Sequence, residues 1–130
     1  MNRVLIAEDS PEIRLLVNRV LMTDGYEVVT VDDGGEAIAK ITEETFDAIV
    51  LDFMMPHTSG FEVIDWLREH RPEVAKSCVI ILTAAVHELK KFDASTVYAT
   101  VTKPFDVYEL RDTVRKCIDS KTRAEDVEAS

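Results

Sequence analysis

The chain has 130 residues, a formal net charge of −10 and 46% hydrophobic residues. This length and apolar content fit one domain with one core, and the acidic charge argues against direct binding of nucleic acid, whose phosphates require a basic surface. No apolar run approaches the about 20 residues of a membrane span, and the N-terminal MNRVLIAEDS holds too short an apolar stretch for a secretory signal. We therefore expect a cytoplasmic protein that does not contact membranes.

Five short runs rich in β-branched residues alternate along the chain with helical patterns. The runs cover residues 4–7, 27–31, 48–51, 78–82 and 98–102. Between and after them, apolar residues recur at spacings of three and four, which predicts amphipathic helices. The clearest stripes are Ile13, Leu16, Val17, Val20 and Leu21; then Phe61, Ile64 and Leu67; and last Val107, Leu110, Val114 and Cys117.

Helix boundary signals agree with this division of the chain. The S-P of residues 10–11 supplies an N-cap and a first-turn proline, and Gly25 follows the end of that helix. The D-G-G of residues 33–35 breaks the chain ahead of a short helix over residues 36–43. The D-x-x-E of residues 106–109 has the spacing of a capping box, which predicts the start of the last helix.

The order of these elements predicts a doubly wound α/β fold, with a five-stranded parallel sheet and helices on both faces. The first, third and fourth runs are apolar throughout, as expected for strands that are buried on both faces. Residues 84–95 carry only a poor helical stripe, which predicts a short or loosely packed helix. We expect one domain over residues 1–120, followed by a polar tail or the start of a linker over residues 121–130.

The cysteines and histidines are scattered. Cys78 and Cys117 lie far apart, each in an apolar stretch, without a C-x-x-C or Cys/His spacing. We expect them to pack in the core rather than to form a disulfide or a metal site. The separation of His57, His70 and His87 likewise argues against a zinc cluster.

Polar residues follow the predicted central strands. In an open parallel sheet, ligands bind beyond the carboxyl ends of the strands. There the first strand is followed by Glu8 and Asp9, the third ends in Asp52, the fourth ends in Thr83, and the fifth is followed by Lys103. Three carboxylates at one edge repel one another, and their oxygens suit a hard divalent cation such as Mg²⁺.

The stretch AIVLDFMMP, residues 48–56, singles out Asp52, whose neighbours are apolar on both sides. A carboxylate in this setting loses hydration and requires a cation or hydrogen-bond donors nearby. With Lys103 as a compensating charge and Thr83 as a hydroxyl donor, the set matches the needs of phosphoryl transfer to a carboxylate nucleophile. Asp52 is the candidate nucleophile, and Glu8 and Asp9 are candidate metal ligands.

Four motifs together resemble the response-regulator receiver domains of two-component signalling. They are Glu8-Asp9; Leu51-Asp52-Phe53-Met54-Met55-Pro56 with Gly60 opening the next helix; Thr83-Ala84; and Lys103-Pro104-Phe105. They occur in the order of that family, and the resemblance covers roughly residues 2–119. It implies the flavodoxin-like strand order 2-1-3-4-5 and a signalling phosphoacceptor rather than an enzyme with a separate substrate.

The resemblance also implies roles for individual residues. Asp52 would accept a phosphoryl group from a histidine kinase or a histidine phosphotransfer protein. The Mg²⁺ ligands, or those of Mn²⁺ in its place, would be Glu8, Asp9, Asp52 and the Met54 backbone carbonyl, while Thr83 and Lys103 would contact the phosphoryl group. The Lys103–Pro104 peptide is commonly cis in this family. The predicted helix in residues 84–95, the fifth strand and the last helix would bind a downstream protein target or form a homodimer.

The sequence departs from the family pattern at the switch and tuning positions. An aromatic residue commonly lies three positions before the lysine, where this chain has Thr100; Tyr98 lies two residues earlier on the same face of the strand. Beside the site, Met54 and Ala85 cannot hydrogen-bond an attacking water molecule. We therefore expect no help from these two side chains in dephosphorylation, and a long-lived phosphorylated state.

The alternative function is a receiver-like interaction module that works without phosphorylation, and the altered switch position keeps it open. A single-domain regulator, a phosphorelay intermediate and a part of a longer protein are equally compatible with the sequence.

Overall fold

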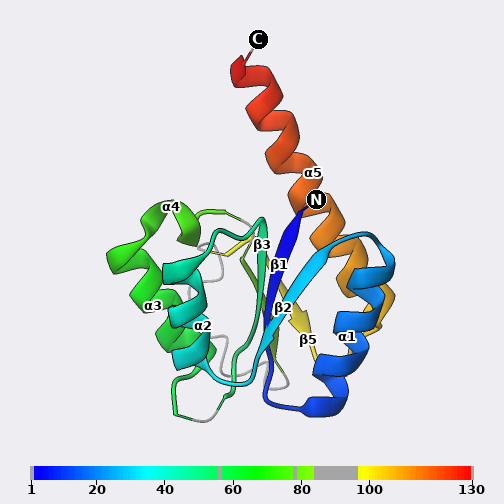
Figure 1. Ribbon diagram of the computed structural model, residues 1–130, viewed down its shortest axis with the longest axis vertical. Coiled ribbons are helices and arrows are strands. Elements are labelled where there is room, and N and C mark those ends of the chain that lie inside the picture. Colours follow the sequence, from blue (N-terminus) through cyan, green and yellow to red (C-terminus); the bar gives the residue numbers. More distant parts are fainter. Residues whose placement is uncertain (1, 56, 78, 84–96, 130) are drawn as a thin grey trace.

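Strands and helices alternate along residues 3–70, as the sequence predicts (Figure 1). The structure is a computed structural model that describes residues 2–55, 57–77, 79–83 and 97–129, with the backbone alone for residues 81–83 and 122–129. The elements are β1 (Arg3–Ala7), α1 (Pro11–Thr23), β2 (Glu27–Val31), α2 (Gly34–Glu43), β3 (Ala48–Asp52), α3 (Gly60–His70), α4 (Pro72–Ala75), β4 (Val79–Thr83), β5 (Ala99–Thr102) and α5 (Val107–Ala129). The one-turn helix α4 was not predicted.

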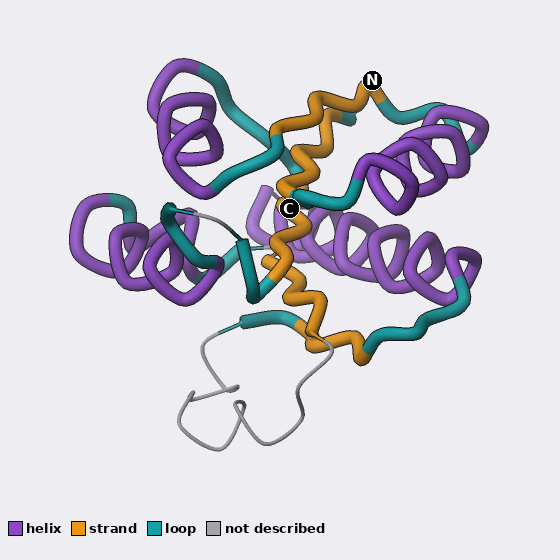
Figure 2. The backbone as a smooth tube through the Cα atoms, turned by 90° about the horizontal axis from the view of Figure 1, so that it is seen from below, coloured by secondary structure: helices purple, strands orange, loops and turns teal. Residues whose placement is uncertain are grey.

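The five strands form one parallel sheet in the order β2-β1-β3-β4-β5, which confirms the predicted doubly wound arrangement. Helices cover both faces of the sheet (Figure 2). Residues that alternate along β1 point to opposite faces, so Leu5 packs with α2 and α3, whereas Val4 packs with α1 and α5. All five residues of β3 are buried, as expected for a central strand with a core on each side.

Each of the four long helices in the described part of the chain begins after a loop that leaves the carboxyl end of a strand, and a side chain caps its first turn. Ser10 accepts a hydrogen bond from the Ile13 backbone N–H, and Asp33 and Ser59 do the same for residues three positions later. Asp106 accepts one from the Tyr108 N–H at the start of α5. The carboxyl ends of the strands and the amino ends of these helices therefore meet at one edge, which we call the carboxyl rim.

Two predictions about the last helix have different outcomes. Cys117 is buried in the core as predicted, but the prediction against a disulfide is wrong, because Cys117 is disulfide-bonded. The other cysteine of the chain, Cys78, lies outside the described residues. Helix α5 continues to Ala129, and Figure 1 shows its last part projecting beyond the sheet. The domain boundary at residue 120 stays a prediction.

The predicted weak helix in residues 84–95 also lies outside the described residues. Within the described part of the chain, no helix is both long and apolar enough to cross a membrane.

Candidate functional site

Three acidic side chains meet at the carboxyl rim, as the sequence predicts. Glu8 and Asp9 follow β1, and Asp52 is the last residue of the neighbouring strand β3. One carboxylate oxygen from each lies within 4.8 Å of the others. Glu8 is 0% exposed and Asp52 is 3% exposed, whereas Asp9 faces solvent. The cluster therefore has a buried part and an open side.

Lys103 lies against the two buried carboxylates. Its Nζ is 3.1 Å from Asp52 Oδ2, 3.1 Å from Glu8 Oε1 and 3.0 Å from Glu8 Oε2. The lysine follows β5, two strands away from β3, so this ion-pair network forms only when the sheet is assembled. The Lys103–Pro104 peptide is cis, as the resemblance implies.

Burial and like charge dominate the electrostatics of this cluster. Burial, and next the charge of Glu8, raise the pKa of Asp52 from 3.8 to about 7, although Lys103 acts in the opposite direction. Burial favours the neutral amine of Lys103, but its hydrogen bonds and ion pairs with Glu8 and Asp52 outweigh this effect and raise its pKa. One lysine therefore does not balance the buried acids, and a further cation is favourable here.

The loop that carries Glu8 is held by backbone contacts. The Glu8 N–H donates to the Val31 carbonyl at 3.1 Å, and Glu8 Oε1 accepts from the Ser10 N–H at 3.1 Å. From the second turn of α1, Arg14 Nη1 donates to the Glu8 carbonyl at 2.9 Å. Arg14 was not predicted as part of the site; the signal in the sequence is a cation one turn into the helix that follows an acidic pair.

The loop between β3 and α3 bends closely around Asp52. The Met54 N–H donates to Asp52 Oδ1 at 3.3 Å, and the Gly60 N–H donates to the Phe53 carbonyl at 3.0 Å. A β-carbon at Gly60 would overlap the Asp52 carbonyl oxygen, so only glycine fits there. The Met54 side chain is 55% exposed beside the cluster.

The remaining predicted residues fall into two groups. Thr83 ends β4 and pairs with Thr102 of β5, which places its backbone at the carboxyl rim next to Lys103; its side chain and Ala85 lie outside the described residues. Thr100 is exposed on β5, and Tyr98 precedes that strand. Because four residues of strand span about 13 Å, Tyr98 lies at the opposite end of β5 from the rim.

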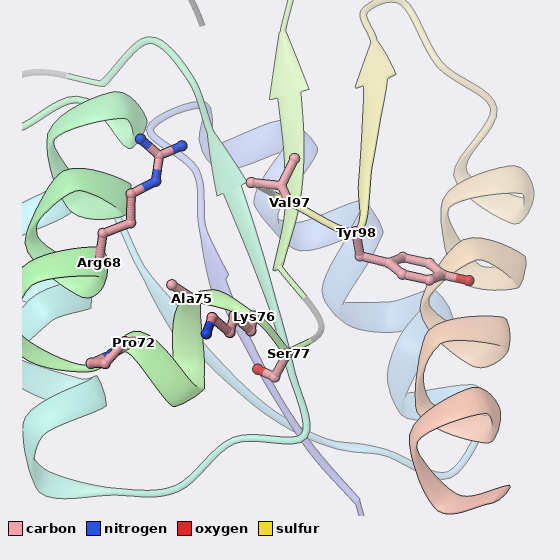
Figure 3. A pocket seen from close by; sticks show the side chains of 7 residues that line it. All are labelled: Arg68, Pro72, Ala75, Lys76, Ser77, Val97 and Tyr98. Carbon is pink, nitrogen blue, oxygen red and sulfur yellow. The ribbon is translucent and has the colours of Figure 1, made fainter. Parts of the chain in front are cut away.

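Tyr98 lines two cavities at that opposite end. One, of about 460 Å³, lies between α3, α4 and the start of β5, and Figure 3 shows the Tyr98 ring directed toward α5. The other includes Cys117 and Lys121 of α5. In the larger cavity, Ser77 Oγ donates to the Val74 carbonyl and Arg68 pairs with Asp65 on the same helix. We assign no site there.

The acidic cluster fits a hard divalent cation. All three side-chain donors are carboxylate oxygens, the ligand type that Mg²⁺ prefers. Glu8 Oε2 is buried and, among the described residues, accepts no hydrogen bond of good geometry, although Lys103 Nζ lies 3.0 Å away. A buried carboxylate oxygen with unused lone pairs is a suitable metal ligand.

Comparison with known proteins identifies the family. The sequence matches the response regulator receiver domain over residues 4–115. The chain belongs to this family. The receiver is 32% identical to sporulation initiation phosphotransferase F of Bacillus subtilis, over 92% of this chain and 96% of that protein. It is 35% identical to the transcriptional regulatory protein TcrA of Mycobacterium tuberculosis, over 83% of this chain but only 42% of that protein.

A solved structure agrees with this assignment. The response regulator protein TrrA of Thermotoga maritima, solved in complex with Mg²⁺ and BeF, superposes on the receiver with a TM-score of 0.80. The two are 33% identical, and the match covers 90% of this chain and 99% of TrrA. Receiver domains of two-component systems are signalling phosphoacceptors that pair with histidine kinases or phosphotransfer proteins.

Proposed function

We propose that the receiver accepts a phosphoryl group on Asp52 from a histidine kinase or a histidine phosphotransfer protein, in a reaction that requires Mg²⁺ or Mn²⁺. The observation that carries this proposal is the buried pair of carboxylates bridged by Lys103, with Asp9 beside it. Such a cluster offers a nucleophilic oxygen, oxygen ligands for a cation and a fixed positive charge within one site.

The transfer is a balanced exchange of one bond for another. An oxygen of the Asp52 carboxylate attacks the phosphorus, and the bond from phosphorus to the histidine nitrogen breaks. The electron pair of that bond stays on the imidazole, which takes a proton from solvent, and Asp52 becomes an acyl phosphate. Lys103 and the Thr83 hydroxyl would contact the phosphoryl oxygens.

The cation would be held by Glu8, Asp9, Asp52 and the Met54 carbonyl. Its chemical contribution is to neutralise negative charge on the phosphoryl oxygens. The exposed thioether of Met54 offers no strong hydrogen bond to water, and Ala85 offers none, so we propose slow loss of the phosphoryl group. Output would use β5, α5 and the predicted helix in residues 84–95, with Thr83, Thr100 and Tyr98 as the residues to test for switching.

Intact-protein mass spectrometry tests the proposal. We expect the receiver to gain one phosphoryl group when it is incubated with Mg²⁺ and acetyl phosphate, and Asp52→Asn to gain none. The closest control is Asp65→Asn on α3, which removes a half-exposed carboxylate and should leave the adduct unchanged. If wild type forms no adduct with any phosphoryl donor and binds no Mg²⁺, the alternative of a phosphorylation-independent interaction module is favoured instead.

We propose that the phosphohistidine partner docks on the exposed apolar residues of α1. Leu15 and Leu16 are each 51% exposed, and α1 starts at the carboxyl rim. Exposed apolar side chains next to a site are typical of protein interfaces. We expect Leu15→Ser to slow phosphoryl transfer from a phosphotransfer protein about tenfold, equivalent to about 1.4 kcal/mol, while phosphorylation by acetyl phosphate stays unchanged.

Met22 provides the matched control for this docking prediction. It is 58% exposed on the same helix, but seven residues farther from the rim, a distance of about 10 Å. Met22→Ser should therefore transfer at the wild-type rate. Equal rates for wild type, Leu15→Ser and Met22→Ser would show that this part of α1 is not the docking surface.

A further inference from the structure

One backbone hydrogen bond joins two loops of the carboxyl rim. The Gly34 N–H, at the start of α2, donates to the Thr58 carbonyl at 3.1 Å. Thr58 lies in the loop between β3 and α3, the same loop that follows Asp52 and contains Met54. The contact therefore connects α2, which supplies none of the acidic residues, to the segment that leaves the phosphorylation site.

Gly34 is a glycine because of this close approach. It is buried, and a β-carbon there would overlap the Thr58 carbonyl oxygen and lie 2.9 Å from the Thr58 carbonyl carbon. Both are backbone atoms, which move only if the whole loop moves. The next residue, Gly35, is exposed; its β-carbon would meet only side-chain atoms, at 3.2 Å from Asp33 Oδ1 and 4.0 Å from Thr58 Oγ1. A methyl group at Gly35 therefore requires only that the Asp33 side chain shifts by a few tenths of an ångström, whereas one at Gly34 requires that the backbone of the loop moves.

Several hydrogen bonds hold the β3–α3 loop. Gly60 N–H binds the Phe53 carbonyl at one end, and Met54 N–H binds Asp52 Oδ1. His57, directly before Thr58, has a φ of 65°, in the left-handed region that residues with a β-carbon seldom adopt. A backbone conformation of this kind persists where surrounding contacts fix it. The Gly34–Thr58 hydrogen bond is such a contact.

We infer that Gly34 is a positioning residue for the cation site: its N–H ties the β3–α3 loop, which follows Asp52 and carries Met54, to the start of α2. This inference rests on the proposed function, because it assumes that the carboxylate cluster and the Met54 carbonyl share a cation. The carboxylates of Glu8 and Asp9 do not depend on this loop. Loss of the contact should therefore weaken cation binding rather than abolish it.

Calorimetric titration with Mg²⁺ tests the inference, with Gly34→Ala and Gly35→Ala as a matched pair. Both variants place alanine in the first turn of α2, so any gain in helix stability is shared. We expect Gly34→Ala to bind Mg²⁺ about tenfold more weakly than wild type, whereas Gly35→Ala stays within about twofold. Phosphorylation by acetyl phosphate should recover in Gly34→Ala when Mg²⁺ is raised to saturation, which a general folding defect would not permit.

Amide hydrogen exchange supplies a second readout that requires neither a phosphoryl donor nor, in its first part, a metal. Without Mg²⁺, amides of residues 53–55 and 57–60 should exchange faster in Gly34→Ala than in Gly35→Ala. In wild type, Mg²⁺ should slow exchange of the Gly34 amide more than that of core amides away from the carboxyl rim, which report only global stabilisation, because coupling between the contact and the cation is reciprocal. This last measurement needs no variant, so it decides the question even if Gly34→Ala does not fold.

The outcomes separate this inference from the proposed function. If wild type binds no Mg²⁺, the proposed cation site is wrong, whatever the loop does. If wild type binds Mg²⁺ but both alanine variants bind it equally well, or the Gly34 amide responds to Mg²⁺ no more than those core amides do, the positioning role of Gly34 is wrong and the phosphorylation site is untouched.

Discussion

Lys103→Met is expected to destabilise the receiver by about 3 kcal/mol at about pH 8 without Mg²⁺, because it leaves buried carboxylates without their cation. Lys103 Nζ lies within 3.1 Å of both Glu8 and Asp52, whose side chains are 0% and 4% exposed. Methionine keeps most of the length of the lysine stem, so packing changes little. The loss therefore measures the charge of the lysine rather than its volume.

Two conditions should reduce the destabilisation caused by Lys103→Met, because each weakens the repulsion between the Glu8 and Asp52 carboxylates. At about pH 5 Asp52 takes up a proton, because its pKa lies at about 7. Added Mg²⁺ replaces the missing positive charge and stabilises the folded state by binding to it. Urea unfolding of wild type and Lys103→Met at both pH values, with and without Mg²⁺, measures all of these differences.

Lys40→Met is the control for removal of a lysine. Lys40 pairs with Glu44 at 3.7 Å on the surface, where the lysine side chain is 41% exposed. Exposed pairs of this kind contribute about 0.5 kcal/mol or less, so we expect a small change that does not respond to Mg²⁺. A similar loss for Lys40→Met and Lys103→Met would contradict the assignment of Lys103 to a strained acidic cluster.

The sheet and the acidic cluster are predictable because both follow from local sequence. The apolar runs that became β1 and β3 are buried as expected, and the change from apolar to acidic residues marks where each strand ends. Once the strands are parallel, their carboxyl ends meet at one rim. Glu8, Asp9, Asp52 and Lys103 could therefore be brought together from the sequence alone.

The contacts that support the cluster were not predictable in this way. Arg14 and Gly34 each donate a hydrogen bond to a backbone carbonyl, of Glu8 and Thr58 respectively. Because every residue has a backbone carbonyl, the sequence does not indicate which one accepts such a bond. Gly34 read as an ordinary break before a helix, whereas its buried position reflects close approach by Thr58. The disulfide of Cys117 was missed for a related reason, because the spacing of two cysteines does not encode their distance in the fold.

Short helices and the switch residues were also difficult to predict from the sequence. Four residues, Pro72–Ala75, are too few to show a helical period, so α4 carried no signal. Strand alternation placed Tyr98 on the same face as Thr100, but it does not show that β5 starts after Tyr98. The side chain of Thr83 and the position of Ala85 lie outside the described residues, so their roles stay predictions.

Asp52→Asn is expected to be more stable than wild type at about pH 8 without Mg²⁺, by a few kcal/mol. In the folded protein the pKa of Asp52 is raised from 3.8 to about 7, chiefly by burial and then by the charge of Glu8. The folded state therefore holds the proton of Asp52 more tightly than the unfolded state. Its contribution to stability is complete below about pH 4 and is lost progressively as the pH rises to about 7.

Asparagine has nearly the same shape as aspartate and no charge, so Asp52→Asn should not lose stability in this way as the pH rises. The two proteins should have similar free energies of unfolding at about pH 4 and diverge as the pH rises, at up to about 1.4 kcal/mol per pH unit. Asp65→Asn again serves as control, because it removes a carboxylate that is 53% exposed on the surface of α3. Parallel pH curves for wild type and Asp52→Asn would contradict the raised pKa.

The order of the two proteins should reverse in saturating Mg²⁺, and this reversal connects stability to function. The negative charge of Asp52 destabilises wild type without a cation and attracts a cation when one is present. Binding of the cation to the folded state then stabilises that state by the free energy of binding. Asp52→Asn has lost one of three carboxylates and should gain less from Mg²⁺. Thermal unfolding at about pH 8 should therefore rank Asp52→Asn above wild type without Mg²⁺ and below it with Mg²⁺. An unchanged ranking would mean that Asp52 does not contribute to cation binding.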